Sequence, residues 1–154
     1  MSPRVNPFSV EPALMQALVD LDAKIVATGL DRALIKLVKI RASQINACAY
    51  CLHMHTADAL AQGEDAKRLF LLDAFEESDL FSRREKAVLR WTEVVTRLET
   101  THASDEEYAR LKSCFADEEI VRLTLVLGMI NVWNRLCSAF RSQHPNDIGK
   151  PQRG

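Results

Sequence analysis

The stretch from Ile120 to Trp133 is apolar nearly all the way round when wound as a helix, and this constrains the fold more than any other segment. Such a helix needs neighbours on every side, so we expect it at the centre of the protein or at a subunit interface. We predict that it runs from Glu118 to about Phe140, with Asp117 as its N-cap. The apolar run LTLVLGMINVW within it is too short, and too polar at its flanks, to predict a membrane span.

Further helices are predicted from apolar residues three and four apart and from capping residues. Ser82 with Glu85 and Ser104 with Glu107 form capping boxes, and Asp31 is a further N-cap. No segment alternates apolar and polar residues as a strand does. We therefore predict an all-α, single-domain bundle of about seven helices, covering approximately residues 12–29, 31–45, 47–62, 65–75, 82–99, 104–113 and 118–140.

The prolines and glycines suggest how the chain is divided. Residues 1–12 contain three prolines and are expected to form an irregular N-terminal arm, packed on a neighbouring subunit. Residues 13–141 form the helical domain, and residues 142–154 are expected to be a flexible tail. The first helix carries one apolar face, made by Leu14, Leu18, Leu21 and Ile25.

Composition narrows the class of protein. The 154 residues are 47% hydrophobic and 27% charged, with a formal net charge of -1. A chain without a basic excess is not expected to bind nucleic acid or an anionic membrane. The N-terminal MSPRVNPFS lacks the apolar region of an export signal, so we expect a cytoplasmic location, where thiols are kept reduced.

The chemistry is concentrated in the motif C-x-x-C-x-x-x-H, formed by Cys48, Cys51 and His55. On a helix these three side chains lie within roughly 60° of arc, because each residue advances about 100°. Cys48 is near the predicted helix start, where the helix dipole favours a thiolate. An imidazole nearby can take or return the proton. The motif therefore predicts dithiol redox chemistry.

Two other interpretations of the motif are weaker. Zinc could draw on Cys48, Cys51, His53 and His55, but His53 points about 160° away from Cys51 on a helix, so a tetrahedral site cannot collect all four ligands. A c-type haem attachment requires His directly after the second Cys, where this chain has Leu52. No metal, haem or flavin cofactor is predicted.

Several other polar or sulfur-containing residues are given structural interpretations. Cys114 and Cys137 are expected to be small core residues. Asn131, Asn134 and Arg135 interrupt the apolar C-terminal helix, so we expect them to satisfy loop carbonyls or to cross a subunit interface.

The segment SQINACAYCLHMH, followed by HTADALAQG, resembles the alkylhydroperoxidase D-like (AhpD-like) branch of the carboxymuconolactone decarboxylase family. The later stretches FSRREKAVLRWTE and INVWNRL strengthen the resemblance, which extends from about Leu14 to Arg141. It implies an AhpD-like helical bundle that assembles into homo-oligomers, either trimers or hexamers.

The resemblance also implies a peroxidase and a role for each motif residue. Cys51 would be the peroxidatic thiol, which becomes a sulfenic acid, and Cys48 would be the resolving thiol and proton donor. His55 would relay the proton. The oxidised state would be a Cys48–Cys51 disulfide, and the partners would be a hydroperoxide substrate and a dithiol reductant such as a lipoyl-bearing protein.

The chain departs from the family pattern at one position. Members of this branch usually carry Glu twelve residues before the first Cys, where this chain has Lys36. A Lys close to a thiol lowers the thiol pKa and disfavours an imidazolium. Asp58, three residues beyond His55, could partly compensate, so Lys36 and Asp58 are candidate modulators. We expect Lys36→Glu to raise the peroxidase rate.

The predicted function is a thiol-dependent alkylhydroperoxidase. Two alternatives remain open. One is a cofactor-free decarboxylase of the carboxymuconolactone type, which does not need the Cys pair. The other is a non-catalytic redox sensor whose disulfide alters assembly.

Overall fold

The computed structural model describes residues 2–144 and contains, within that range, nine α-helices, one 3-10 turn and no strand. All seven expected helices are present, so the predicted all-helical fold is confirmed. The two additional helices, α1 and α7, have four residues each. In chain order the elements are α1 (Pro7–Val10), α2 (Pro12–Val26), α3 (Arg32–Ile45), α4 (Ala49–Ala61), α5 (Ala66–Phe70), η1 (Leu72–Ala74), α6 (Arg83–Thr96), α7 (Leu98–Thr101), α8 (Asp105–Lys112) and α9 (Asp117–Phe140).

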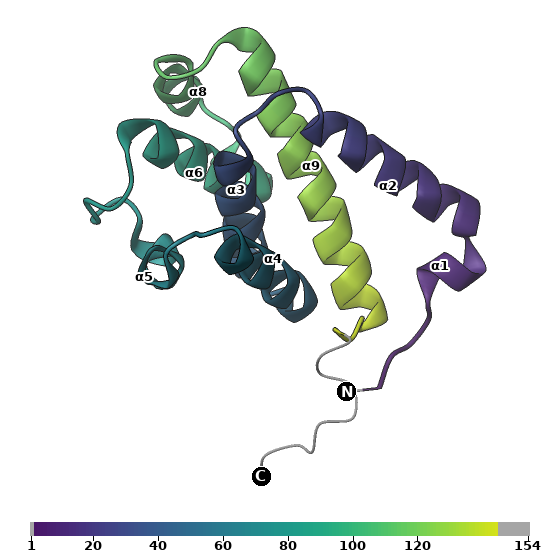
Figure 1. The fold of residues 1–154 in the computed structure, drawn as a ribbon. Coiled ribbons are helices and arrows are strands. Elements are labelled where there is room, and N and C mark those ends of the chain that lie inside the picture. The colour runs from purple at the N-terminus through teal and green to yellow at the C-terminus, as the bar shows by residue number, and fades with distance from the viewer. Residues whose placement is uncertain (1, 145–154) are drawn as a thin grey trace.

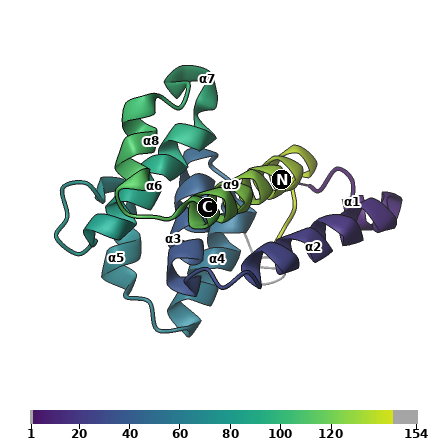
Figure 2. The same ribbon diagram turned by 90° about the horizontal axis from the view of Figure 1, so that it is seen from above.

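The long helix α9 is the axis of the arrangement. It packs against α2 on one side and against α3, α4 and α6 on the other (Figures 1 and 2). Its side chains Leu123, Val126, Leu127 and Ile130 are fully buried and belong to the larger of two apolar clusters. The expectation that this helix is central is therefore confirmed.

The same helix passes a simple test for a membrane span. An 18-residue stretch of this 24-residue helix has a mean hydropathy of 1.3, so by length and composition the helix is sufficient to cross a bilayer. The apolar run LTLVLGMINVW is by itself too short to predict a membrane span, but the helix continues on both sides of it. The packing of α9 within the bundle gives these apolar residues another role, as the core of the fold.

The helix starts follow local capping. The carboxylate of Asp31 accepts a hydrogen bond from Ala33 N–H at 2.8 Å, and Ser82 and Glu85 form the predicted reciprocal box. The prediction for α9 is wrong by one residue, since Ala116 is the N-cap and Asp117 is already helical. The Glu119 carboxylate accepts from the Ala116 N–H at 3.1 Å and so stabilises this earlier start.

Two predicted helices are shorter than expected. The segment 82–99 breaks at Arg97, whose ψ of 39° is not helical, and continues as α7. The segment 65–75 divides into α5 and the 3-10 turn η1.

At α8, the Ser104 hydroxyl accepts a hydrogen bond from the Glu107 N–H, as predicted. The Glu107 carboxylate, however, accepts from Arg90 Nε at 2.7 Å, which ties α8 to α6.

The N-terminal part differs from expectation in two ways. The arm is not wholly irregular, since it contains α1, and the predicted face of α2 is only partly buried. Ile25 is buried, whereas Leu14 and Leu21 are 64% and 45% exposed, because among the long helices α2 packs mainly on α9. Most of the predicted tail, residues 145–154, lies outside the described residues.

Candidate active site

Cys48 and Cys51 lie at the start of α4 and are joined by a disulfide, with their Cα atoms 5.4 Å apart. Cys48 is the N-cap residue, and its Sγ accepts a hydrogen bond from the Cys51 N–H at 3.4 Å. The predicted pairing and the position of Cys48 are both confirmed. The amide and the helix dipole stabilise negative charge on the Cys48 sulfur, which favours its departure as thiolate when the disulfide opens.

A buried polar network holds the turn before Cys48. Ala47 in this turn has a φ of 50°, and the Asn46 amide donates to the side-chain oxygens of Asn131 and Asn134, both at 2.9 Å. Asn134 in turn donates to Ser43 Oγ at 3.0 Å. The two Asn residues of α9 were expected to meet loop carbonyls or a partner subunit. Instead they bind the side chains of Ser43, on α3, and of Asn46, in the turn before the motif, and so fix where α4 begins.

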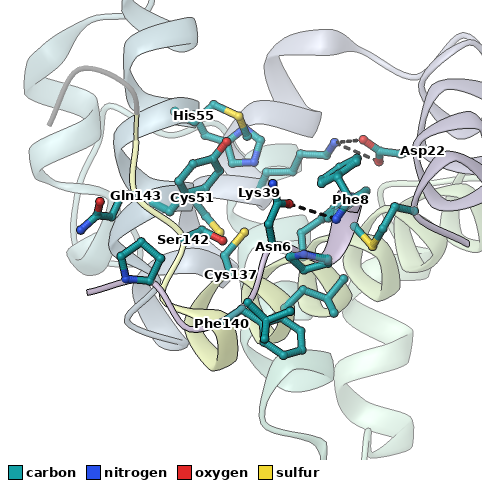
Figure 3. Close-up of a pocket in the computed structure, with 18 residues that line it drawn as sticks. Asn6, Phe8, Asp22, Lys39, Cys51, His55, Cys137, Phe140, Ser142 and Gln143 are labelled. Carbon is teal, nitrogen blue, oxygen red and sulfur yellow. Dashed lines mark hydrogen bonds and ion pairs between the residues drawn. The ribbon is translucent and has the colours of Figure 1, made fainter. Parts of the chain in front are cut away.

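The disulfide borders a cavity of about 540 Å³, and Cys51 and His55 both line it (Figure 3). Both cysteines are almost fully buried, but only Cys51 of the pair lines the cavity. Apolar side chains dominate the wall, and the polar ones come from α2, α3, α4 and the chain termini. The other lining residues are Pro3, Val5, Asn6, Pro7, Phe8, Met15, Asp22, Lys39, Tyr50, Met54, Trp133, Leu136, Cys137, Phe140, Ser142 and Gln143.

The N-terminal arm closes part of this cavity from within the same chain. Arg4 N–H donates to the Phe140 carbonyl at 3.0 Å, and the Arg4 guanidinium donates to the Ala139 carbonyl at 3.0 Å. These bonds tie the arm to the C-terminal end of α9. Asn6 then caps α1 by accepting from Phe8 N–H at 3.1 Å. The arm is thus a wall of the cavity, and whether it also contacts a neighbouring subunit stays a prediction.

An ion pair forms another part of the wall. The Lys39 ammonium contacts the two Asp22 carboxylate oxygens at 3.0 and 2.9 Å, and both side chains are largely buried. Neither residue was expected from the sequence to be part of the site. They come from different helices, so no spacing along the chain brings them together; Figure 3 shows them facing each other.

His55 is held neutral by its surroundings. Burial and then the Lys39 ammonium lower its pKa from 6.5 to about 4, against the opposing effect of Asp58 and Asp22. Near pH 7 the imidazole therefore has one nitrogen free to accept a proton. Such a group can act as a base toward a thiol in the same cavity.

The two candidate modulators lie in different places. Asp58 is exposed on α4, and its charge raises the pKa of His55, in the expected direction. Lys36 is partly buried on α3, but the α3 cation that lines the cavity is Lys39, three residues further along. A role for Lys36 stays a prediction.

The remaining candidate ligands and thiols are also placed. His53 stacks on His144 with ring centroids 3.7 Å apart, outside the cavity lining. Within residues 2–144, no three His, Cys, Asp or Glu side chains form a group that could hold a metal ion. Cys137 is only partly buried and lines the cavity, so it is not the simple core residue expected; burial raises the pKa of its thiol.

Comparison with known proteins places the chain in a family. The model of the carboxymuconolactone decarboxylase family matches residues 12–94. The uncharacterized protein YdfG of Bacillus subtilis is 37% identical over 139 residues, which cover 90% of this chain and 95% of that protein. Both matches include the cysteine motif.

Solved structures agree with this assignment. A protein of unknown function from Agrobacterium tumefaciens, provisionally assigned as the antioxidant defence protein AhpD, is 37% identical, with a TM-score of 0.90 over 94% of this chain and 99% of that one. The debrominase Bmp8 has a TM-score of 0.76 at 19% identity, over 88% of this chain and 73% of that one, and shares the fold alone. The chain therefore belongs to the carboxymuconolactone decarboxylase family, and within that family it is AhpD-like.

Proposed function

We propose that the protein is a thiol-dependent alkylhydroperoxidase that works through a Cys48–Cys51 dithiol/disulfide cycle. The observation that carries the proposal is that one sulfur of the disulfide, that of Cys51, shares a cavity with the neutral imidazole of His55. A hydroperoxide entering this cavity meets the motif thiol of Cys51 and the imidazole base of His55; the other thiol of the lining, that of Cys137, has its pKa raised by burial. The redox-active group in this cycle is the protein's own disulfide.

In the first step His55 accepts the Cys51 proton, and the thiolate attacks the distal oxygen of the hydroperoxide. An S–O bond forms, the O–O bond breaks, and the alkoxide leaves as an alcohol after it takes up a proton. The Cys51 sulfur loses two electrons and becomes a sulfenic acid. Cys51 suits this role better than Cys48 because it lines the cavity.

In the second step Cys48 attacks the Cys51 sulfenic acid. An S–S bond forms, the S–OH bond breaks, and the hydroxide leaves as water after taking up the Cys48 proton. An external dithiol, such as a lipoyl-bearing protein, then attacks the sulfur of Cys51 from the cavity that it lines and releases Cys48 as a thiolate. The hydrogen bond from Cys51 N–H stabilises that leaving group. A cycle that ends in reduction by a dithiol fits a reducing compartment, so we place the protein in the cytoplasm.

We further propose that the chain assembles into a homo-oligomer, as a trimer or hexamer. Large apolar side chains that α1, α2 and α9 leave exposed support this, since such side chains are often covered by a partner subunit. They are Val10, Leu14, Leu21, Val121 and Leu125, each at least 45% exposed.

The test is hydroperoxide consumption with dithiothreitol or dihydrolipoamide, comparing wild type with Cys51→Ser and Cys48→Ser. We expect sustained turnover by the wild type and none by Cys51→Ser. Cys48→Ser should form a sulfenic acid on Cys51, detected with dimedone by mass spectrometry, without closing a disulfide. Cys114→Ser is the matched control, because Cys114 lies outside the cavity lining, and it should behave as wild type.

The alternatives give different outcomes. Equal rates in the wild type and both active-site variants would rule out the peroxidase proposal. Turnover of a lactone that survives double Cys→Ser substitution would favour the decarboxylase. Oxidation of one equivalent of protein without sustained turnover would favour a redox sensor.

A further inference from the structure

The cavity beside Cys51 is much larger than a peroxide group requires. Its volume of about 540 Å³ falls in the range of roughly 300–1,000 Å³ found for pockets that enclose small organic molecules. Hydrogen peroxide has only two non-hydrogen atoms and would leave most of this space unused. The size therefore points to a substrate with a substantial body attached to its peroxide group.

The lining indicates what that body is made of. Most of the lining is apolar, and its larger apolar side chains include Val5, Phe8, Met15, Trp133, Leu136 and Phe140. In the view of Figure 3, His55, Lys39 and Asp22 lie on one side of the cavity and Phe140 on the other, with Cys51 and Cys137 between them. A peroxide group held at Cys51 would leave its body facing these apolar side chains.

The charges in the wall cancel. Among the lining residues that the structure describes, Lys39 is the one cation and Asp22 the one anion, and they are paired with each other. Recognition of a carboxylate or phosphate on the substrate would require a cation without such a partner. This arrangement favours an uncharged body.

We infer that the substrate is an uncharged hydroperoxide with a large alkyl or aryl body, and that the N-terminal arm, through Val5 and Phe8, determines this preference. The inference rests on the proposed peroxidase function and deepens it. The arm is suited to the role because it is fixed to α9 by both hydrogen bonds of Arg4, so its two apolar side chains are held at the wall. Phe8 is 51% exposed, so it can be truncated without opening the core.

The first measurement is kcat/KM for a series of n-alkyl hydroperoxides from ethyl to octyl, with hydrogen peroxide for comparison. Each methylene that enters the apolar part of the cavity should raise kcat/KM up to about fourfold, until the cavity is filled. Phe8→Ala should lower kcat/KM for the octyl compound several-fold and leave the ethyl compound nearly unchanged. Phe70→Ala is the matched control, because Phe70 is 83% exposed on α5 and outside the cavity; it should keep the wild-type series.

A second measurement does not depend on turnover. Binding of 1-butanol, 1-hexanol and 1-octanol, which are unreactive mimics of the alcohol products, is followed by the fluorescence of Trp133. We expect affinity to rise with chain length, octanoate to bind more weakly than 1-octanol, and the signal to disappear in Trp133→Phe. Trp91, on α6 with its indole N–H bonded to Thr124 Oγ1 at 3.0 Å, lies outside the cavity and should not report binding.

The two measurements separate the inference from the function on which it rests. Turnover that is equally fast for ethyl and octyl hydroperoxides would overturn the inference and leave the peroxidase proposal intact. Alcohol binding that strengthens with chain length, without any hydroperoxide turnover, would support the apolar cavity and overturn the peroxidase proposal. If Phe8→Ala leaves the dependence of kcat/KM on chain length unchanged, the role of the arm is overturned. If octanoate binds more tightly than 1-octanol, the requirement for an uncharged body is overturned.

Discussion

The Lys39 ammonium lies 2.9 and 3.0 Å from the two carboxylate oxygens of Asp22, on the wall of the cavity that also contains His55. The pair connects α3 to α2 and brings both charges close to the imidazole. Lys39 lowers the His55 pKa and Asp22 raises it, so the pair adjusts the imidazole in opposite directions. Burial of the imidazole is the larger cause, and Lys39 adds to it.

The ion pair predicts how substitution of Lys39 changes His55. We expect Lys39→Met to raise the His55 pKa from about 4, because it removes a cation that disfavours the imidazolium and leaves Asp22 and Asp58 to favour it. The measurement is an NMR titration of the His55 ring. Lys36→Met is the matched control on the same helix and should leave that pKa nearly unchanged. A larger shift with Lys36→Met would show that Lys36, as the family pattern suggests, is the group that acts on His55.

The low His55 pKa predicts a pH dependence of stability. Between pH 6.5 and 4 the unfolded chain protonates this imidazole while the folded protein keeps it neutral, so the unfolded state binds more protons and the free energy of unfolding falls as pH falls. A shift of this size corresponds to about 2–3 kcal/mol across the window, and above about pH 6.5 the contribution is complete. Urea unfolding at pH 7 and pH 4.5 measures it. In His55→Gln the decrease in the free energy of unfolding between pH 7 and pH 4.5 should be smaller by about 2–3 kcal/mol. A decrease equal to that of the wild type would contradict the prediction.

Features set by neighbouring residues could be predicted from the sequence. The caps at Asp31 and Ser82 and the Cys48–Cys51 pair depend on contacts across two to three positions, and all are found in the structure. The start of α9 was misplaced by one residue, because both Ala116 and Asp117 allow a helix start and the Glu119 carboxylate selects the earlier one.

Features set by tertiary packing could not be predicted. Lys39 and Asp22 belong to separate helices, and a family position directed attention to Lys36 instead. The arm is held at the cavity by the hydrogen bond from the Arg4 N–H to the Phe140 carbonyl, which connects residues near opposite ends of the chain. Nothing in a three-proline segment indicates such a partner. Short-range sequence patterns thus indicated the reactive cysteine pair, whereas the residues that line the cavity could be identified only from the fold.

The turn before Cys48 contains a backbone strain that glycine would relieve. Ala47 has a φ of 50°, a left-handed conformation that costs an L-residue about 1–2 kcal/mol, whereas glycine loses about 0.5–1 kcal/mol through its greater freedom in the unfolded chain. We therefore expect Ala47→Gly to raise the free energy of unfolding by about 0.5 kcal/mol. Ala57→Gly, at an exposed position inside α4, is the control and should lower it by about 1 kcal/mol. Equal destabilisation by both would contradict the assigned turn conformation.

The unequal placement of the two sulfurs predicts unequal alkylation in the reduced protein. Both cysteines are almost fully buried, but Cys51 lines the cavity and Cys48 does not, so in Cys48→Ser the remaining motif thiol should react with iodoacetamide faster than in Cys51→Ser. The helix dipole opposes this difference because it favours the Cys48 thiolate. Its contribution of about 0.3–1 kcal/mol can raise the alkylation rate of Cys48 at most about fivefold. Rates are read for each cysteine by peptide mass spectrometry, with Cys114 as the internal reference. Faster modification of Cys48 would mean that it is the thiol that meets small molecules first, and the roles of the two cysteines would be exchanged.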